Sequence, residues 1–179
     1  INIGAIAADL LEKELSQFTM TEKEFDSEVR KLPSALEHAD ILELIFDITT
    51  KMFLRLLNLP AKMHSWYLFC DQVETSFLAV SLGFEGEFQG QYIVNVNKQV
   101  LTHACNYCFA DEGLPEGLTE NDVMAEIVNI IGGNIATSLS DNGLYSEIDI
   151  PELFENCHGQ IQLPKDMKNL LFKVETPLG

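Results

Sequence analysis

Residues 119–134 read TENDVMAEIVNIIGGN, and this stretch has the pattern of a helix with one narrow polar ridge. At about 100° of rotation per residue, four polar or small residues fall within a sector about 60° wide. These four residues are Asp122, Glu126, Asn129 and Gly133. The opposite side carries the apolar residues Val123, Met124, Ile127, Val128, Ile130 and Ile131. Thr119 is suited to cap this helix, because Asp122 stands three residues later, where a capping box has its acid. The stretch therefore predicts a helix with a buried back and a polar front.

The composition indicates one globular domain that repels polyanions. The 179 residues are 46% hydrophobic, and 11 basic against 28 acidic residues give a formal charge of −17. That length allows one sizeable core but not two ordinary domains. The negative charge repels phosphate backbones and anionic lipids, so neither nucleic acid nor a membrane is an expected partner. No apolar run approaches the roughly 20 residues of a membrane span, and the first residues lack the pattern of a secretory signal. We therefore expect a cytoplasmic protein, although the sequence begins at Ile1 and residues upstream of it stay open.

The cysteines offer a second, weaker motif. The chain has four of them, at Cys70, Cys105, Cys108 and Cys157. In a domain of this size they are expected to be reduced thiols. Cys105 and Cys108 form a CxxC pair, which would be a metal site if His103, Cys157 and His158 joined it. The same spacing in an amphipathic helix places two small apolar residues on one buried face. We favour the buried face and expect no metal bound by this chain.

In the rest of the chain, the spacing of the apolar residues changes several times between a helical and a strand pattern. Ser34–Asn58 and Lys98–Ala110 have apolar residues at spacings of three and four, which predicts two helices, the first ending at Leu59-Pro60. Between them, Val73–Asn97 alternates β-branched and aromatic residues and predicts a β-hairpin that is broken at Glu85-Gly86.

Within this hairpin, Gly83 and Gly90 are expected at a bulge or a close approach of backbones. After the central helix, three short segments rich in strand formers follow: Tyr145–Ile150, Gly159–Leu163 and Leu170–Val174. Such segregated runs of strands and helices predict an α+β domain whose antiparallel sheet carries helices on one face.

The first residues have a helical pattern of their own. Residues 1–31 are rich in Ala, Leu, Glu and Lys, and Thr19 or Thr21 is suited to cap a second helix before Pro33 breaks the pattern. We favour a packing helix here, while an exposed amphipathic stretch that docks a partner stays open.

The polar ridge also resembles a known family. The motif Asp122-x-x-x-Glu126-x-x-Asn129, continued by IIGGN at 130–134, resembles the active-site helix of the CheC/CheX/FliY chemotaxis phosphatases, and of their CheX-like members in particular. GFEGEFQGQYIVNVN at 83–97 resembles the central hairpin of CheX-like domains, and LELIFDITTKMFLRLLNLP at 42–60 resembles their first helix. Pro151 is a candidate for the proline that follows the family's motif, although the LFENCHG segment after it departs from the pattern.

This resemblance covers residues 35–177 and implies a domain organisation and a fold. Residues 1–34 become an N-terminal helical extension, and 35–179 a CheX-like phosphatase domain. The implied fold is an antiparallel β-sheet with long helices packed on one face. A homodimer formed through sheet edges is also implied, since an exposed edge can extend its ladder into a second copy.

The resemblance further implies a hydrolase that stimulates hydrolysis of the aspartyl phosphate on a CheY-type response-regulator receiver domain, in chemotaxis or two-component signalling. Its catalytic residues would be Glu126, which pairs with the receiver's active-site lysine, and Asn129, which orients the attacking water. Asp122, Glu126 and Gly133 would contact the partner. This chain would bind no cofactor, because the receiver already holds the Mg²⁺ ion that such a reaction uses.

Two other functions stay open. The first is a non-catalytic dimerisation or docking module in a signalling or flagellar complex. The second is a thiol or metal enzyme at Cys105 and Cys108, which would need exposed thiols close to His103 or His158. An exposed Glu and Asn also commonly do no more than solvate a surface helix.

Overall fold

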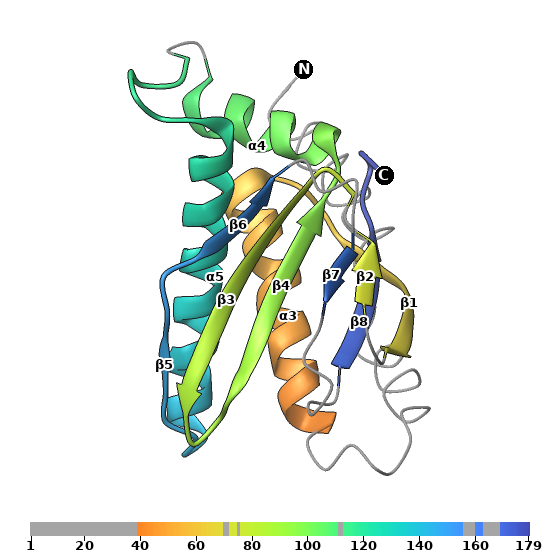
Figure 1. Cartoon of the computed structure of the whole chain (residues 1–179), viewed down its shortest axis with the longest axis vertical. Helices are drawn as coiled ribbons and strands as arrows, with labels where there is room; N and C mark the ends of the chain where they lie inside the picture. The colour runs from red at the N-terminus through yellow and green to blue at the C-terminus, as the bar shows by residue number, and fades with distance from the viewer. Residues whose placement is uncertain (1–38, 70–71, 75, 111–112, 156–159, 163–168) are drawn as a thin grey trace, which may run out of the picture.

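The computed structural model describes residues 39–179 except 70–71, 75, 111–112, 156–159 and 163–168 (Figure 1). The predicted extension at 1–34 lies outside the described residues, as do Cys70, Cys157 and His158. The helices are α3 (Ala39–Leu57), α4 (Lys98–Phe109) and α5 (Glu120–Asp141). The strands are β1 (Lys62–Phe69), β2 (Gln72–Glu74), β3 (Leu78–Gly86), β4 (Gly90–Val96), β5 (Ser146–Ile148), β6 (Glu152–Glu155), β7 (Gln160–Gln162) and β8 (Asn169–Glu175).

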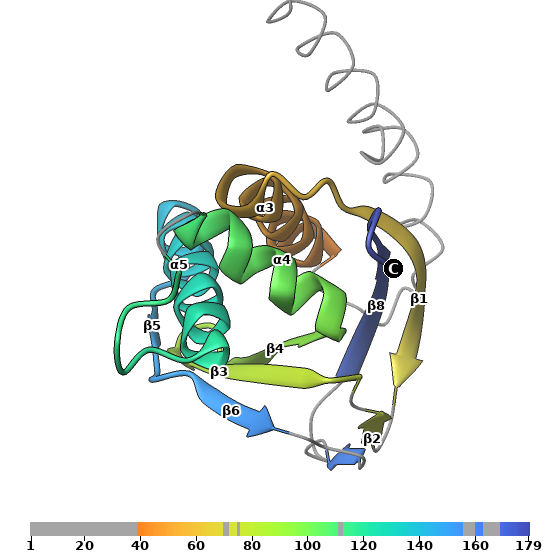
Figure 2. The same cartoon turned by 90° about the horizontal axis from the view of Figure 1, so that it is seen from above.

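The central strand of the main sheet is β3. It pairs along one side with β4, from Leu78↔Val96 to Phe84↔Gly90. Its other side pairs with β6 near Leu78 and with β5 near Phe84. All of these pairings are antiparallel, as are the separate pairs β1–β8 and β2–β7. Figure 2 shows the three helices on the same side of β3 and β4, which is the α+β arrangement that the sequence predicts.

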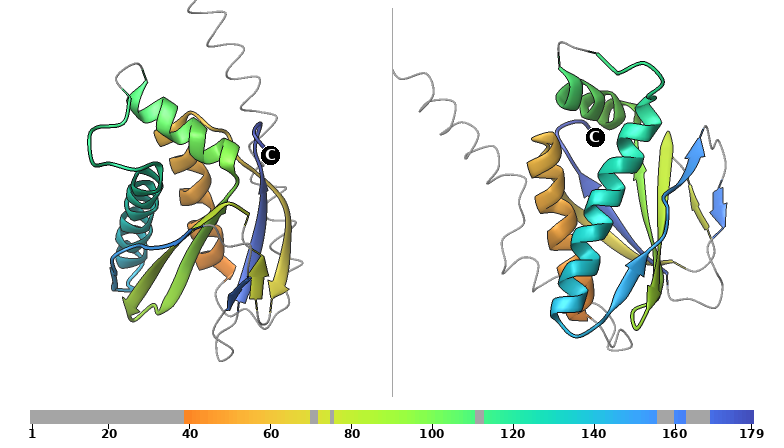
Figure 3. Two further views of the ribbon diagram at one scale, coloured as in Figure 1. Left: turned by 45° about the horizontal axis from the view of Figure 1, so that its top comes forward. Right: turned by 90° about the vertical axis from the view of Figure 1, so that its left-hand side faces the viewer.

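The core lies between this sheet and the helices. Leu82 and Phe84 of β3 face α5 at Gly132, whose missing side chain lets the helix approach the strand. On the β4 side, the Thr49 hydroxyl of α3 and the hydroxyl of the half-buried Tyr92 share a hydrogen bond of 2.9 Å. Helix α3 therefore covers β4 while α5 covers β3, and α4 crosses the end of both helices (Figure 3).

The predicted helices that fall on described residues are confirmed, and their ends have local causes, whereas the helices predicted within residues 1–31 lie outside the described residues. Helix α3 stops at Leu57 because Asn58 takes a left-handed conformation with φ 48° and Pro60 follows. Helix α4 begins where the Asn97 side chain accepts a hydrogen bond from Val100 N–H at 2.8 Å. Helix α5 begins after Thr119 as predicted and continues to Asp141, beyond the quoted stretch.

The strand predictions are confirmed in part. The hairpin β3–β4 forms, but its predicted break at Glu85-Gly86 is wrong, since both residues still pair with β5 and the turn lies at 87–89. Gly83 is a position of close approach, because a Cβ atom there would overlap the Asp149 carboxylate. Gly90 is not such a position, since its nearest neighbour is Phe88 at an ordinary 3.7 Å. The strands β1 and β6 were not predicted, and Val73, which was assigned to the hairpin, belongs instead to β2, which pairs with β7. The four residues of β6 carry little pattern of their own and form a strand through their pairing with β3.

Candidate polar ridge of helix α5

A complete capping box fixes the start of the ridge. Thr119 Oγ1 donates to Asp122 Oδ2 at 2.6 Å and accepts from Asp122 N–H at 3.2 Å. The backbone N–H of Thr119 donates to the same carboxylate oxygen at 2.8 Å. These bonds from the Thr119 side chain and backbone lower the pKa of Asp122. Asp122 is therefore an ionised cap that holds the first turn of α5 in place.

The ridge continues along the free side of α5. Glu126 is exposed, and Asn129 and Gly133 are half-buried. Among the described residues, no hydrogen bond or ion pair engages the Glu126 or Asn129 side chain. The space beside Gly133 is open, because a Cβ atom there would meet no heavy atom within 4 Å. The structure thus leaves the Glu126 carboxylate and the Asn129 carboxamide one turn apart and without a bonding partner among the described residues. The open space beside Gly133 follows them on the ridge.

The back of α5 is buried as the pattern predicts, with one exception. The buried residues of this helix are Val123, Met124, Ile127, Val128, Ile131, Gly132, Ile135 and Leu139. Ile130 packs against the core but is only partly buried, so the prediction that it is fully buried was wrong. On one flank α5 contacts α3, and on the other it runs beside the segment that contains β5 and β6 (Figure 3).

The cysteine pair forms no site with the other described residues. Cys105 is buried and Cys108 is exposed, so the expectation that both share a buried face was wrong for Cys108. Burial, with the nearby Glu120 and Cys108 charges, raises the pKa of Cys105 to about 11. The pKa of Cys108 is also raised by desolvation. Reactive thiols have lowered pKa values, so neither cysteine is an activated nucleophile.

No metal site is present among the described residues, because none of their His, Cys, Asp and Glu side chains gather in groups of three or more. His103 has a structural contact, since its Nε2 atom lies 2.8 Å from the Leu57 carbonyl oxygen at the end of α3. Its ring also stacks on Tyr107 with centroids 6.0 Å apart.

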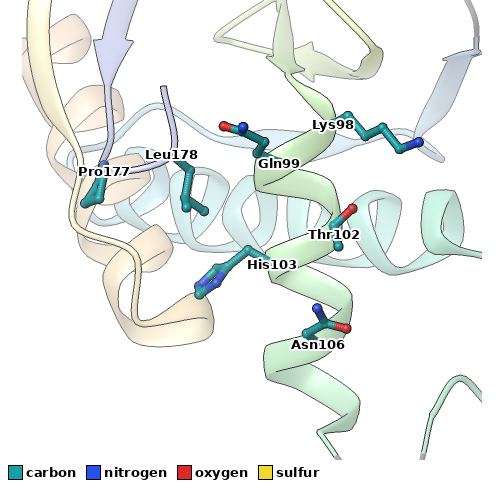
Figure 4. Close-up of a pocket in the computed structure, with 7 residues that line it drawn as sticks. All are labelled: Lys98, Gln99, Thr102, His103, Asn106, Pro177 and Leu178. Atoms are coloured by element: carbon teal, nitrogen blue, oxygen red, sulfur yellow. The ribbon is translucent and has the colours of Figure 1, made fainter.

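A shallow depression of about 700 Å³ lies on α4 beside the C-terminal residues. It is lined by Lys98, Gln99, Thr102, His103, Asn106, Pro177 and Leu178 (Figure 4). None of these belongs to α5, so the depression is separate from the ridge. The predicted site residues Asp122, Glu126, Asn129 and Gly133 all belong to α5, and none of them lines this depression.

By length and composition, α5 is also the one described helix that would be able to cross a membrane. However, α5 packs against α3 and β3, and the core helix of a globular domain meets the same criterion. Its length and composition therefore do not indicate a membrane span.

One residue beside the ridge escaped the sequence analysis. Ile150, between β5 and β6, is 86% exposed, although it was expected to end a strand. The only local signal was the proline that follows it.

Comparison with known proteins identifies the fold and the family. The family model for the chemotaxis phosphatase CheX matches residues 78–175, more than half of the chain. No curated protein is similar enough in sequence to count as a relative.

Several solved structures share the fold. A CheX structure from Desulfovibrio desulfuricans superposes with a TM-score of 0.70 at 17% identity, covering 78% of this chain and 93% of that one. The complex of CheX with CheY, BeF₃ and Mg²⁺ from Borrelia burgdorferi gives 0.56 at 19% identity, covering 77% and 90%. FliY from Thermotoga maritima gives 0.52 at 16% identity, covering 89% and 86%. The matched segment contains the hairpin β3–β4 and the whole ridge of α5, and the chain therefore belongs to the CheX family of chemotaxis phosphatases.

Proposed function

We propose that this chain stimulates hydrolysis of the aspartyl phosphate on a CheY-type receiver domain. The observation that carries the proposal is the unengaged pair Glu126 and Asn129, one turn apart on the ridge of α5. The partner class comes from the Borrelia burgdorferi relative, which was solved as a complex with CheY. We also place the chain in the cytoplasm, where such receivers are phosphorylated.

The reaction requires little from the phosphatase itself. Water attacks the phosphorus atom in line, the P–O bond to the receiver's aspartate breaks, and the carboxylate leaves as an anion with no need of a proton. The proton of the attacking water passes to the phosphate product. The Mg²⁺ ion that balances the phosphoryl charge belongs to the receiver, so this chain contributes position rather than a cofactor.

Asn129 suits the task of holding that water. Its carboxamide offers both an acceptor and two donors, and it does not titrate near neutral pH. Glu126 lies one turn earlier and is exposed, so its carboxylate can reach a lysine on a docked protein. The two residues would therefore have different roles. Glu126 would bind the receiver, and Asn129 would orient the attacking water.

The neighbouring ridge residues support the same surface. Asp122 is held by Thr119, so its charge has a fixed position at the start of the ridge, where a docked partner would meet it. A glycine inside a helix costs about 0.5–1 kcal/mol relative to alanine, and no heavy atom of the described residues lies within 4 Å of a Cβ atom built at Gly133. A glycine at this position fits a place where a partner's backbone approaches closely.

The experiment is to phosphorylate a panel of receiver domains from the source genome and to follow phosphate release with and without this protein. Asn129→Ala should abolish the stimulation with little change in receiver binding, and Glu126→Ala should weaken binding as well. Asn106→Ala is a matched control, because Asn106 is an exposed asparagine on α4, outside the motif and the ridge. It should behave as the wild type.

Two outcomes would overturn the proposal. The first is a wild-type protein that accelerates no receiver, and the second is an Asn129 variant as active as the wild type. If a receiver binds without losing phosphate faster, a docking module takes the place of the phosphatase.

A further inference from the structure

The edge of the main sheet beside α5 contains an extra residue. Phe84 pairs with Ile148, and Ser81 pairs with Glu152. Between these two pairs β3 has two residues, whereas the opposite chain has three, at positions 149–151. Asp149 N–H donates to the Gly83 carbonyl at 3.0 Å, so Ile150 and Pro151 share the place opposite Leu82. An extra residue of this kind pushes the edge outward, as a β-bulge does.

This bulge lies level with the end of the ridge. Leu82 is the residue that Gly132 of α5 packs against, and neighbouring strands are about 4.8 Å apart. Ile150 is therefore one strand further out from Leu82, at the height of Gly132 and Gly133. Helix α3 occupies one flank of α5, and the segment that contains β5 and β6 occupies the other (Figure 3). The bulge therefore borders the exposed side of α5 on the flank that α3 does not occupy.

A docked receiver has to cover more than the ridge. The seven-residue step from Glu126 to Gly133 spans about 10 Å along the helix. A stable interface needs about 800 Å² from each partner, a patch roughly 30 Å across. The contact must therefore extend sideways, over either α3 or the β5–β6 edge.

The apolar side chains favour the β5–β6 edge. Both flanks carry exposed charged residues, namely Asp47, Lys51 and Arg55 on α3 and Glu147, Asp149 and Glu152 on the β5–β6 edge, so charge does not distinguish them. Among the described residues, the large hydrophobic side chains that are exposed are Tyr107, Leu118, Tyr145 and Ile150, and Ile150 has the highest exposed fraction at 86%. Interfaces take most of their energy from a few buried apolar or aromatic anchors near their centre.

We propose that Ile150 is an apolar contact for the receiver that Glu126 and Asn129 engage, and that it determines affinity and choice of receiver rather than the chemistry. This inference rests on the proposed function for the identity of the partner. It is independent of the motif, since it follows from the strand register and the exposure of one side chain.

The test compares Ile150→Asp with the wild type on the receiver panel, at varied concentrations of phosphorylated receiver. The concentration that gives half-maximal stimulation should rise about tenfold, because an apolar contact of this size is lost on replacement by a carboxylate. The maximal rate of phosphate release should stay the same. Ile150→Val, which keeps an apolar side chain, should restore most of the affinity.

Tyr107→Ser is the matched control, because Tyr107 is exposed at 48% on α4, away from the ridge. It should leave both quantities unchanged. Binding to receivers activated with beryllofluoride, measured by titration, gives a second readout that needs no hydrolysis.

The outcomes separate the two proposals. If the wild type accelerates a receiver and Ile150→Asp does so at the same half-maximal concentration, the role of Ile150 is refuted and the phosphatase stands. If the wild type binds receivers without accelerating them, the phosphatase fails, and a weakened titration with Ile150→Asp still supports the contact. If the wild type neither binds nor accelerates any receiver, both proposals are overturned.

Discussion

Gly132 of α5 lies so close to Leu82 of β3 that a methyl group at position 132 would overlap Leu82 Cδ2. The next residue, Gly133, has no heavy atom within 4 Å of the equivalent position. Glycine is therefore suited to these two adjacent positions for different reasons. The first allows the helix to pack on the sheet, and the second leaves the polar ridge open.

The two glycines should respond to alanine in opposite directions. Gly132→Ala is expected to lower the free energy of unfolding by about 1–3 kcal/mol, because it overpacks a tight contact. Gly133→Ala is expected to raise it by about 0.5–1 kcal/mol, because alanine loses less backbone entropy in a helix. Urea unfolding of both variants measures this. A shift of the same sign in both would show that the contact with Leu82 does not decide the packing.

The ridge and the back of α5 should differ in their effect on stability. Glu126→Ala and Asn129→Ala should change the free energy of unfolding by less than about 0.5 kcal/mol, as is usual for solvated surface positions. Ile127→Ala and Ile131→Ala should cost about 2–5 kcal/mol, since both side chains are buried in the core. Thermal unfolding compares all four, and a large loss in Asn129→Ala would indicate a structural rather than a functional residue.

The capping box should affect how the stability of the protein depends on pH. Thr119→Ala is expected to cost about 1 kcal/mol at neutral pH through the lost N-cap. The pKa of Asp122 is lowered in the folded state, so between the unfolded value of about 3.9 and the lower folded value the unfolded chain binds more protons. The stabilisation by Asp122 is therefore complete above the unfolded pKa and is lost as the pH falls through the folded one. Melting temperatures from pH 6 downward should decline less steeply for Asp122→Asn than for the wild type, and parallel curves would contradict this.

The cysteines should differ in reactivity. Cys108 is exposed and should alkylate in the native protein, more slowly than a free thiol because its pKa is raised. Cys105 is buried, with a pKa of about 11, and should react only after unfolding. Peptide mapping after treatment with iodoacetamide distinguishes the individual positions. Fast labelling of Cys105 in the native protein would revive the thiol-enzyme hypothesis.

The assembly predicted from the family resemblance is a homodimer through sheet edges. The 20.1 kDa chain should then show about twice that mass by light scattering at working concentrations. Among the described strands, β4 is the terminal strand of the main sheet on the side away from the bulge, and a terminal strand is where a second copy can extend the ladder. A proline substitution in β4 at a residue that faces outward should shift the mass toward the monomer, and a monomeric wild type would refute the prediction.

Local pattern was enough to predict α5 and its polar ridge. The spacing of Asp122, Glu126 and Asn129 follows from helical geometry, and the Thr119 cap follows from side-chain chemistry within one turn, so neither needs the rest of the fold. The helix α3 and the hairpin β3–β4 were predictable for the same reason. Their hydrophobic patterns continue over many residues, and the residues that end them lie next to them in the sequence.

Only the tertiary structure decided what depends on contacts between distant segments. The short strand β6 exists because β3 offers it a partner, and the burial of Cys105 but not Cys108 depends on which side of α4 meets α5. The roles of Gly132 and Gly133 are indistinguishable in sequence and differ because one of them faces Leu82. The place of Ile150 beside the ridge follows from a register difference across β3, a property of paired strands that the pattern of a single segment does not contain.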